Sequence, residues 1–253
     1  MAKKAIGIDI GGTGIKGALV DVKNGVLVSE RVRYETPEGG HPSDIAIVVA
    51  KLVRDLKPSR ATLPVGVCFP AVVQHGRTMS AANVSKEWIG LDADGLFENT
   101  LQRHVHVLND ADAAGVAEMK FGAGKKRKGL VVMTTLGTGI GTALFMNGVL
   151  IPNAELGHIE IDGVDYETQA AYSAKEKEGL TFEQWAERLQ KYYSTLEHLF
   201  SPDLFIVGGG ISKQWEEFLP KLKLNTEILP ALKRNNAGIL GAAALAWKHS
   251  DSE

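Results

Sequence analysis

Residues 11–20 read GGTGIKGALV and residues 136–145 read LGTGIGTALF, so the chain carries nearly the same glycine-rich segment twice. Shifting the chain by 125 positions gives six identities over positions 12–20. Both copies continue into the same four residues, NGVL, at 24–27 and at 147–150. Because Asn-Gly between apolar runs is a strong hairpin signal, each copy is predicted to be a glycine turn followed by a β-hairpin.

The elements around the two copies also follow the same order. In the first half, hydrophobic patterning predicts strands at 5–10, 18–22, 26–33 and 64–73 and a helix at 44–56. The second half is predicted to contain a strand at 129–136, the strand GTALFMN, a helix at 181–200 and the strand LFIVGGG. Thr181 and Gln184 resemble a capping box at the start of that helix. The repeat therefore covers a whole α/β domain rather than a short motif.

We therefore predict an α/β fold of two similar domains with a cleft between them. The N-terminal domain is predicted at 1–108, with a C-terminal helix at 236–253 packing back near it, and the second domain at 109–235. This arrangement would bring the two glycine turns face to face. Two opposed turns could hold one polyanion from both sides.

Composition limits the possible partners. The 253 residues carry a net charge of −2 and are 44% hydrophobic, which gives no general affinity for nucleic acid or an anionic membrane. No apolar run of 18 residues and no signal-peptide pattern is present, so we expect a cytoplasmic protein. The single cysteine, Cys68, excludes an internal disulfide and a cysteine-rich zinc site. Its apolar surroundings indicate a buried side chain.

The glycine turns differ from the common nucleotide-binding loops. Residues 12–17 match G-x-G-x-x-G, but that fingerprint needs a following helix, and here a hairpin follows. Neither turn has the spacing of a P-loop. What remains is a strand–turn–strand loop whose N–H groups can donate to phosphate oxygens. The alternative is a pair of tight hairpins in which glycine serves only the backbone geometry.

Asp9 lies on an otherwise apolar strand just before the first turn, and its counterpart in the second copy is Thr134. A carboxylate in this position is costly unless it is paired or binds a cation. Mg²⁺, held directly or through water, is a natural partner beside a phosphate loop. The alternative is an aspartate that accepts hydrogen bonds from the turn amides.

Two further segments carry candidate catalytic groups. Asn109 and Asp110 follow a strand that ends near Leu108, where either could cap the next helix. In a cleft, Asp110 could instead orient a hydroxyl and accept its proton. Glu155 and His158, in the segment Glu-Leu-Gly-His, could both hydrogen-bond a polyol. A lone histidine is more often structural, and the other six histidines form no metal-ligand cluster.

The sequence resembles the ROK sugar kinases of the actin-like ATPase superfamily. The matching segments span nearly the whole chain and are IGIDIGGTGIKGALV (6–20), LNDADAAG (108–115), TTLGTGIGTAL (134–144), AELGHIEID (154–162), FIVGGGIS (205–212) and NNAGILGAA (235–243). The Glu-x-Gly-His is the most family-specific of them. The resemblance implies two ribonuclease-H-like domains with an interdomain cleft.

The resemblance also implies a role for each matching residue. Asp110 would be the general base that accepts the proton of the sugar hydroxyl. Sugar hydroxyls would be bound by Asn83, Asn109, Glu155, His158 and Glu167. Phosphate and Mg²⁺ would be held by Asp9, Gly11, Gly12, Thr13, Gly14 and Lys16, and phosphate also by Gly137, Thr138 and Gly139. A nucleotide would be flanked by Gly208, Gly209 and Gly210.

The chain departs from the family pattern at two places. Most members carry a cysteine-rich zinc motif after the Glu-x-Gly-His, but residues 163–173 (GVDYETQAAYS) occupy that place without cysteine, so we predict no zinc site. Glu167 aligns with the glutamate that ends this motif. Pro70-Ala71 stands where relatives often have Pro-Gly.

Within the family, the segments FSPDLFIVGGGISK and NVSKEWIG and the zinc-less insert are most similar to the polyphosphate-using glucokinases and glucomannokinases. The resemblance therefore implies a homodimer that phosphorylates the 6-hydroxyl of glucose, and of mannose, with polyphosphate or ATP. The alternatives are an ATP-only glucokinase, another hexose or N-acyl-hexosamine kinase, and a sugar-sensing regulator. A regulator would need an N-terminal DNA-binding domain, and the first predicted strand starts by residue 5. A filament-forming actin-like ATPase would not need the Glu-x-Gly-His.

Lys125, Lys126, Arg127 and Lys128 form the only run of four basic residues. One interpretation is a solvated connector whose cations lie near a helix C-terminus. The resemblance favours another, because a linear polyphosphate longer than ATP needs cations beyond the reacting phosphoryl group.

Overall fold

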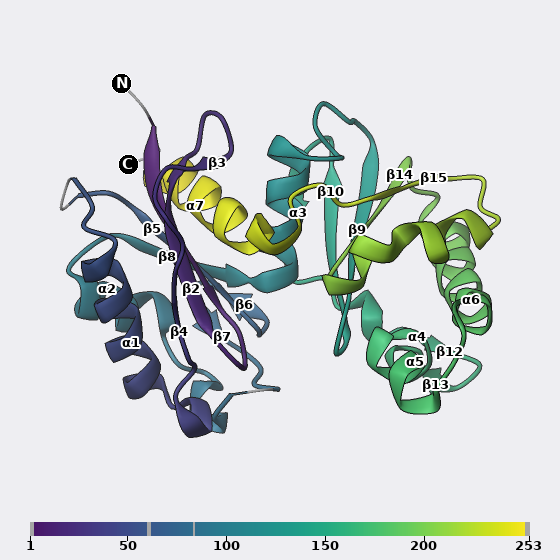
Figure 1. Cartoon of the computed structure of the whole chain (residues 1–253), viewed down its shortest axis with the longest axis horizontal. Coiled ribbons are helices and arrows are strands. Elements are labelled where there is room, and N and C mark those ends of the chain that lie inside the picture. The colour runs from purple at the N-terminus through teal and green to yellow at the C-terminus, as the bar shows by residue number, and fades with distance from the viewer. Residues whose placement is uncertain (1–2, 60–61, 83, 251–253) are drawn as a thin grey trace. The chain divides into compact units, whose positions relative to one another are not determined.

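The computed structural model describes residues 3–59, 62–82 and 84–250. The chain divides into two compact units, one of Met1–Ala117 with Asn236–Glu253 and one of Glu118–Asn235 (Figure 1). The division between the units falls after Ala117, inside α3 (Asp110–Phe121). The domain boundary that we predicted after residue 108 precedes this helix, and it stays a prediction.

The first unit is built on a six-stranded sheet in the order β3-β2-β1-β5-β8, with β4 also pairing with β2. Its strands are β1 (Lys4–Ile10), β2 (Ile15–Asp21), β3 (Val26–Leu27), β4 (Val32–Tyr34), β5 (Val65–Phe69) and β8 (Val105–Asn109). β2 is antiparallel to β1, whereas β1, β5 and β8 run parallel. The carboxyl ends of these three strands therefore lie at one edge, and Asp9 is level with Cys68 on its neighbour.

Alternation along β1 assigns its side chains to two faces, as the sequence predicts. Ile6, Ile8 and Ile10 belong to the core that also contains the apolar faces of α1 (Pro42–Asp55) and α2 (Ala93–Leu101). The opposite face lies against α7 (Ala237–Ser250), which is yellow in Figure 1. A Cβ on Gly7 of β1 would overlap the carbonyl oxygen of Ile239, so the absence of a side chain allows the backbone of α7 to lie directly on the sheet.

The single strand expected at 26–33 is wrong, because β3 and β4 are separate short strands. Between them, the Ser29 hydroxyl accepts a hydrogen bond from the Leu19 amide at 2.9 Å and donates to the Glu30 carbonyl. A side chain thus takes the place of a backbone acceptor, which interrupts the ladder.

The second unit repeats the pattern in a five-stranded sheet of order β11-β10-β9-β14-β15. Its strands are β9 (Leu130–Leu136), β10 (Ile140–Met146), β11 (Val149–Ile151), β14 (Leu204–Gly208) and β15 (Glu227–Pro230). β10 is antiparallel to β9, as β2 is to β1, and β14 is parallel to β9, as β5 is to β1. The predicted α/β class and the repeat of a whole sheet unit are confirmed.

α6 (Phe182–Phe200) covers this second sheet. Its N-terminus has the predicted capping box between Thr181 and Gln184. Its buried stripe includes Trp185, Leu189 and also Tyr192, which is fully buried and completes the core. Short elements follow β11 and precede α6, namely a 3-10 turn (Leu156–His158), β12 (Glu160–Ile161), β13 (Val164–Asp165), α4 (Glu167–Ala170) and α5 (Tyr172–Glu178).

Within the described residues, none of the helices combines the length and the apolar composition that crossing a bilayer requires.

Candidate active site

The first glycine turn is closed by a hydrogen bond from the Gly11 amide to the Gly14 carbonyl at 3.0 Å. The Thr36 hydroxyl donates to the Gly11 carbonyl at 2.5 Å, and the Arg33 guanidinium donates to the Thr13 carbonyl at 3.4 Å. Neither Gly11 nor Gly14 has a left-handed backbone, so glycine is not needed here for its φ angle. A Cβ on Gly14 would lie 3.0 Å from Arg33 Nε, a tight contact that a small shift of the arginine side chain would relieve.

Asp9 pairs with a lysine and a thiol. It lies opposite Lys16 on β2, with 3.8 Å between Nζ and Oδ2, and Cys68 donates its S–H to Oδ1 at 3.3 Å. Burial, helped by the charges of Asp9 and Asp110, raises the pKa of the Cys68 thiol well above its usual value, so it remains a donor. The cost of the carboxylate is thus offset by pairing. Lys16, predicted to bind phosphate, lies beside this aspartate.

Asn109 and Asp110 mark the junction of β8 and α3. The Asn109 side-chain oxygen accepts from the amides of Ala111 (2.8 Å) and Asp112 (3.1 Å), and its NH₂ group donates to the Ala71 carbonyl at 3.1 Å. The capping interpretation is therefore confirmed for Asn109. Asp110 is exposed, and one of its carboxylate oxygens accepts from the Ala111 amide at 2.8 Å.

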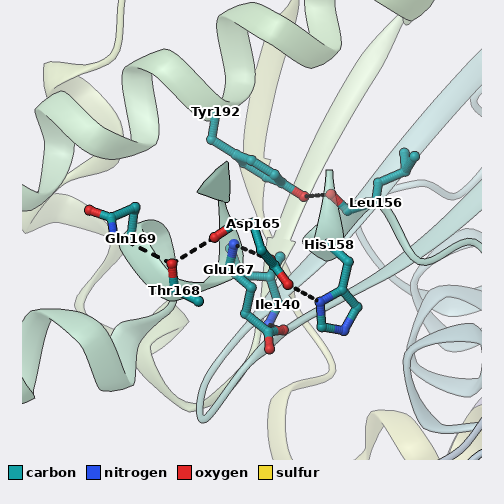
Figure 2. Close-up of polar contacts among 8 residues, drawn as sticks. All are labelled: Ile140, Leu156, His158, Asp165, Glu167, Thr168, Gln169 and Tyr192. Atoms are coloured by element: carbon teal, nitrogen blue, oxygen red, sulfur yellow. Dashed lines mark hydrogen bonds and ion pairs between the residues drawn. The ribbon is translucent and has the colours of Figure 1, made fainter. Parts of the chain in front are cut away.

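The Glu-x-Gly-His segment is fixed on β10. The Thr142 hydroxyl donates to the Ala154 carbonyl and accepts from the Leu156 amide, and Tyr192 of α6 donates to the Leu156 carbonyl at 3.2 Å (Figure 2). A Cβ on Gly157 would overlap the carbonyl oxygen of Ile140, which explains the glycine in this motif. The segment is therefore held in place by the surrounding fold.

Glu155, His158 and Glu167 form one electrostatic group with a residue that the sequence did not single out, Asp165. The His158 Nδ1 lies 2.9 Å from Asp165 Oδ2, and this hydrogen bond is the main reason why the pKa of His158 is raised. The pKa of Glu155 is raised as well, chiefly because protein displaces water from its carboxylate, while His158 opposes the shift.

The imidazole of His158 is accessible, with 54% of its side chain exposed. Its Nε2 points away from Asp165 and has no hydrogen-bond partner in the described part of the chain (Figure 2). A ligand hydroxyl can therefore reach it.

The second glycine turn is closed by the Gly137 amide, which donates to the Gly139 carbonyl at 3.0 Å. A Cβ on Gly137 would meet no described atom within 4 Å, whereas one on Gly139 would lie 2.5 Å from a carboxylate oxygen of Glu167. Gly209 has a left-handed φ of 85° and would overlap the backbone of Leu136 if it carried a Cβ. Gly208, Gly209 and Gly210 thus lie beside the base of this turn.

The basic run is exposed but not uniform. Arg127 forms an ion pair with Glu227 of β15 at 2.8 Å, whereas Lys125, Lys126 and Lys128 have no ion-pair partner among residues that the structure describes. In the described chain the run therefore contains three lysines without an ion-pair partner and one arginine whose charge Glu227 neutralises, and its role towards polyphosphate stays a prediction.

Glu118 was also missed by the sequence reasoning. It is fully buried, and its carboxylate accepts from the Ala123 amide at 2.8 Å and from the Lys233 amide at 2.5 Å. This carboxylate joins the loop that leads into the basic run to the segment that carries Lys233 and Arg234.

Two predictions stay untested, namely the role of Asn83 and a Mg²⁺ ion held by Asp9 directly or through water. Asn83 lies outside the described residues. Among residues 3–59, 62–82 and 84–250, no three His, Cys, Asp or Glu side chains group closely enough to hold a metal ion.

Comparisons with known proteins agree with this geometry. Residues 5–174 match the sequence model of the ROK family. The chain is 45% identical to a polyphosphate glucokinase of Mycobacterium tuberculosis over 242 residues, covering 95% of this chain and 90% of the relative. The crystal structure of an inorganic polyphosphate/ATP-glucomannokinase from Arthrobacter sp. strain KM superposes with a TM-score of 0.91 at 53% identity, covering 97% and 99% of the two chains. A ROK family glucokinase from Streptomyces griseus, in complex with glucose and AMPPNP, has the same fold, with a TM-score of 0.82 at 24% identity and coverage of 97% and 99%.

Proposed function

Because the chain belongs to the ROK family, we propose that it transfers a phosphoryl group from inorganic polyphosphate or ATP to the 6-hydroxyl of glucose. The observation that carries this proposal is the identity of 45% and 53%, over nearly the whole chain, to a polyphosphate glucokinase and a polyphosphate/ATP-glucomannokinase. Mannose as a second acceptor, a homodimer and a cytoplasmic location belong to the same proposal.

The acceptor side consists of one base and several groups that orient hydroxyls. Asp110 is exposed, and one of its carboxylate oxygens accepts a hydrogen bond from the Ala111 amide. This bond orients the carboxylate, whose other oxygen can then accept the proton of the sugar hydroxyl. His158 Nε2 and the Glu155 carboxylate bind sugar hydroxyls. Asn109 uses its oxygen and one N–H in the fold, so it contributes its second N–H. Asn83 and Glu167 complete the proposed set.

The donor side consists of the two glycine turns. Their N–H groups, together with Lys16, bind the oxygens of the transferred phosphoryl group and reduce its charge as the bond to the leaving group breaks. Gly208 to Gly210 flank the nucleotide when ATP is the donor. Asp9 is a hard oxygen ligand that would hold Mg²⁺ directly or through water, and the bound ion would neutralise phosphate charge.

Polyphosphate requires cations beyond the reacting group, and three free lysines of the basic run supply them. Glu118 joins the Lys233 amide to the loop that leads into the basic run, so Lys233 and the adjacent Arg234 add to this surface. Arg127 contributes less, because Glu227 already neutralises it. We assign the polyphosphate chain to this basic surface.

A matrix of donors against sugars tests the proposal. Polyphosphate and ATP are each paired with glucose, mannose and N-acetylmannosamine, and the sugar phosphate is quantified. We expect glucose to be phosphorylated with both donors and mannose to be the second acceptor. Activity with ATP alone would reduce the function to an ATP glucokinase. Activity only with N-acetylmannosamine would favour a hexosamine kinase, and sugar binding without transfer would favour a regulator.

A further inference from the structure

A continuous chain of hydrogen bonds runs from the imidazole of His158 to the end of the second glycine turn (Figure 2). Asp165 Oδ2 pairs with His158 Nδ1 at 2.9 Å, and Asp165 Oδ1 accepts from the Glu167 amide at 3.1 Å. Glu167 Oε2 in turn accepts from the Ile140 amide at 2.7 Å. Ile140 is the first residue after the turn, so two carboxylates span the distance between a sugar-side group and a phosphate-side loop.

The same insert also anchors the turn itself. The Ser173 amide donates to the Gly137 carbonyl at 3.1 Å, and the Ser173 hydroxyl donates to the Thr138 carbonyl at 2.6 Å. The Glu167 carboxylate occupies the space that a side chain at Gly139 would need. Three consecutive turn residues and Ile140 are therefore all in contact with residues 163–173.

We propose that residues 163–173 form a brace that couples the sugar-binding imidazole to the phosphate-binding turn, with Asp165 and Glu167 as its positioning residues. The inference rests on the proposed function, because that function assigns His158 to sugar and the 137–139 turn to phosphate. Hydrogen bonds between these two carboxylates and backbone amides hold the brace against the turn.

Asp165 acts by fixing the state of the imidazole. A carboxylate on Nδ1 holds a proton there and leaves Nε2 to face the ligand. The groups that face His158 are Asp165 on β13, Glu167 on α4 and Glu155 before the 3-10 turn, and all three raise its pKa while burial lowers it. Removing the charge at Asp165 therefore changes both the orientation and the titration of the ring.

Glu167 acts on the backbone. Its carboxylate fixes the Ile140 amide and packs against Gly139, so the turn cannot move without breaking a charge-assisted hydrogen bond. A glutamine at this position keeps an oxygen acceptor, whereas an alanine removes it. Comparing E167Q with E167A therefore separates the effect of the hydrogen bond to the Ile140 amide from the effect of the negative charge.

The first experiment compares D165N with D162N. Asp162 lies in the same hairpin and pairs with Lys191 instead of the imidazole, so D162N makes the same chemical change outside the brace. We expect D165N to raise the KM for glucose about tenfold, the loss typical of one charge-assisted hydrogen bond, and to lower the pH at which His158 titrates in imidazole NMR. D162N should change neither. Equal effects of the two variants would overturn the role of Asp165.

The second experiment follows the other end of the brace by the hydrogen exchange of the Ile140 amide and the KM for the donor. E167A should speed exchange and raise the donor KM several-fold, and E167Q should restore both. D165N should also speed exchange at Ile140, because the two ends are coupled, and an unchanged rate would refute the coupling. If the wild-type chain phosphorylates no sugar, the proposed function fails, while the NMR and exchange measurements still decide whether Asp165 and Glu167 hold these groups.

Discussion

Replacing Lys125, Lys126 and Lys128 together with alanine is expected to weaken the use of polyphosphate and to spare that of ATP. These lysines are exposed and without an ion-pair partner in the described chain, so their charge is available to a polyanion. Arg127 provides the matched control, because its charge is already neutralised by Glu227. The variant Arg127→Ala removes a positive charge from the same run, but this charge is already paired with a carboxylate.

The magnitude follows from the exposure of the three side chains. An exposed ion pair contributes roughly 0.2–1 kcal/mol, so losing three contacts costs about 0.6–3 kcal/mol. This corresponds to an increase in the KM for polyphosphate of roughly 3-fold to 150-fold. By analogy with single-stranded nucleic acid, each lost contact also lowers the slope of log KM against log salt by about 0.7, or about 2 for the triple variant.

The assay measures glucose 6-phosphate formation with polyphosphate of one defined length and with ATP, each at several salt concentrations. The KM for ATP should change less than about twofold, because the three lysines precede β9 whereas the second glycine turn follows it, at the other end of the strand. An equal rise in KM for both donors would mean that the run is structural. An effect of Arg127→Ala as large as that of the triple variant would refute the distinction between free and paired cations.

The remaining predictions concern the base, the packing of α7 and a half-buried histidine. Asp110→Ala should lower kcat by about 10²–10⁴ while glucose binding stays measurable by calorimetry, and near-normal turnover would contradict its role as base. Gly66→Ala should destabilise the fold by about 1–3 kcal/mol in thermal melts, because the new Cβ would overlap the Ala242 carbonyl. Gly210→Ala is its control, since a Cβ there meets no described atom within 4 Å. Burial, helped by His249 and His104, lowers the pKa of His106 from 6.5 to about 4, so the unfolded chain binds the proton first. The free energy of unfolding should therefore be highest above pH 6.5 and fall as the pH drops towards 4, by at most about 3 kcal/mol, and His106→Gln should flatten this dependence.

Local patterns predicted the elements whose cause is local. The capping box of Thr181 and Gln184, the alternation along β1 and the repeated glycine turn with its hairpin all depend on neighbours in the sequence. The cap formed by Asn109 was foreseen as one of two interpretations for the same reason. The break at Ser29 was missed, because a serine that replaces a backbone acceptor looks like any polar residue in an exposed strand.

The polar partners that make the site were not predictable, since they come from distant segments or from an irregular insert. Arg127 is neutralised by Glu227, 100 residues later, and nothing near either residue signals the pair. In the sequence, Asp165 looks like an ordinary surface carboxylate. Its role is visible only in the fold, where the β12–β13 hairpin places it next to His158. Glu118 reads as a polar residue in a helix, yet its buried carboxylate joins two loops. Sequence motifs therefore point to the groups that we propose to contact substrate, whereas the fold was needed to find the residues that hydrogen-bond to those groups.

The most direct test of the central claim is the formation of glucose 6-phosphate by the purified chain from glucose, polyphosphate and Mg²⁺ in nucleotide-free solution, followed by ³¹P NMR. The proposed function predicts a new phosphomonoester signal at the 6-position that grows as polyphosphate shortens, and its loss in Asp110→Ala. Absence of any sugar phosphate from polyphosphate, under conditions in which the wild-type chain binds glucose, would contradict the account.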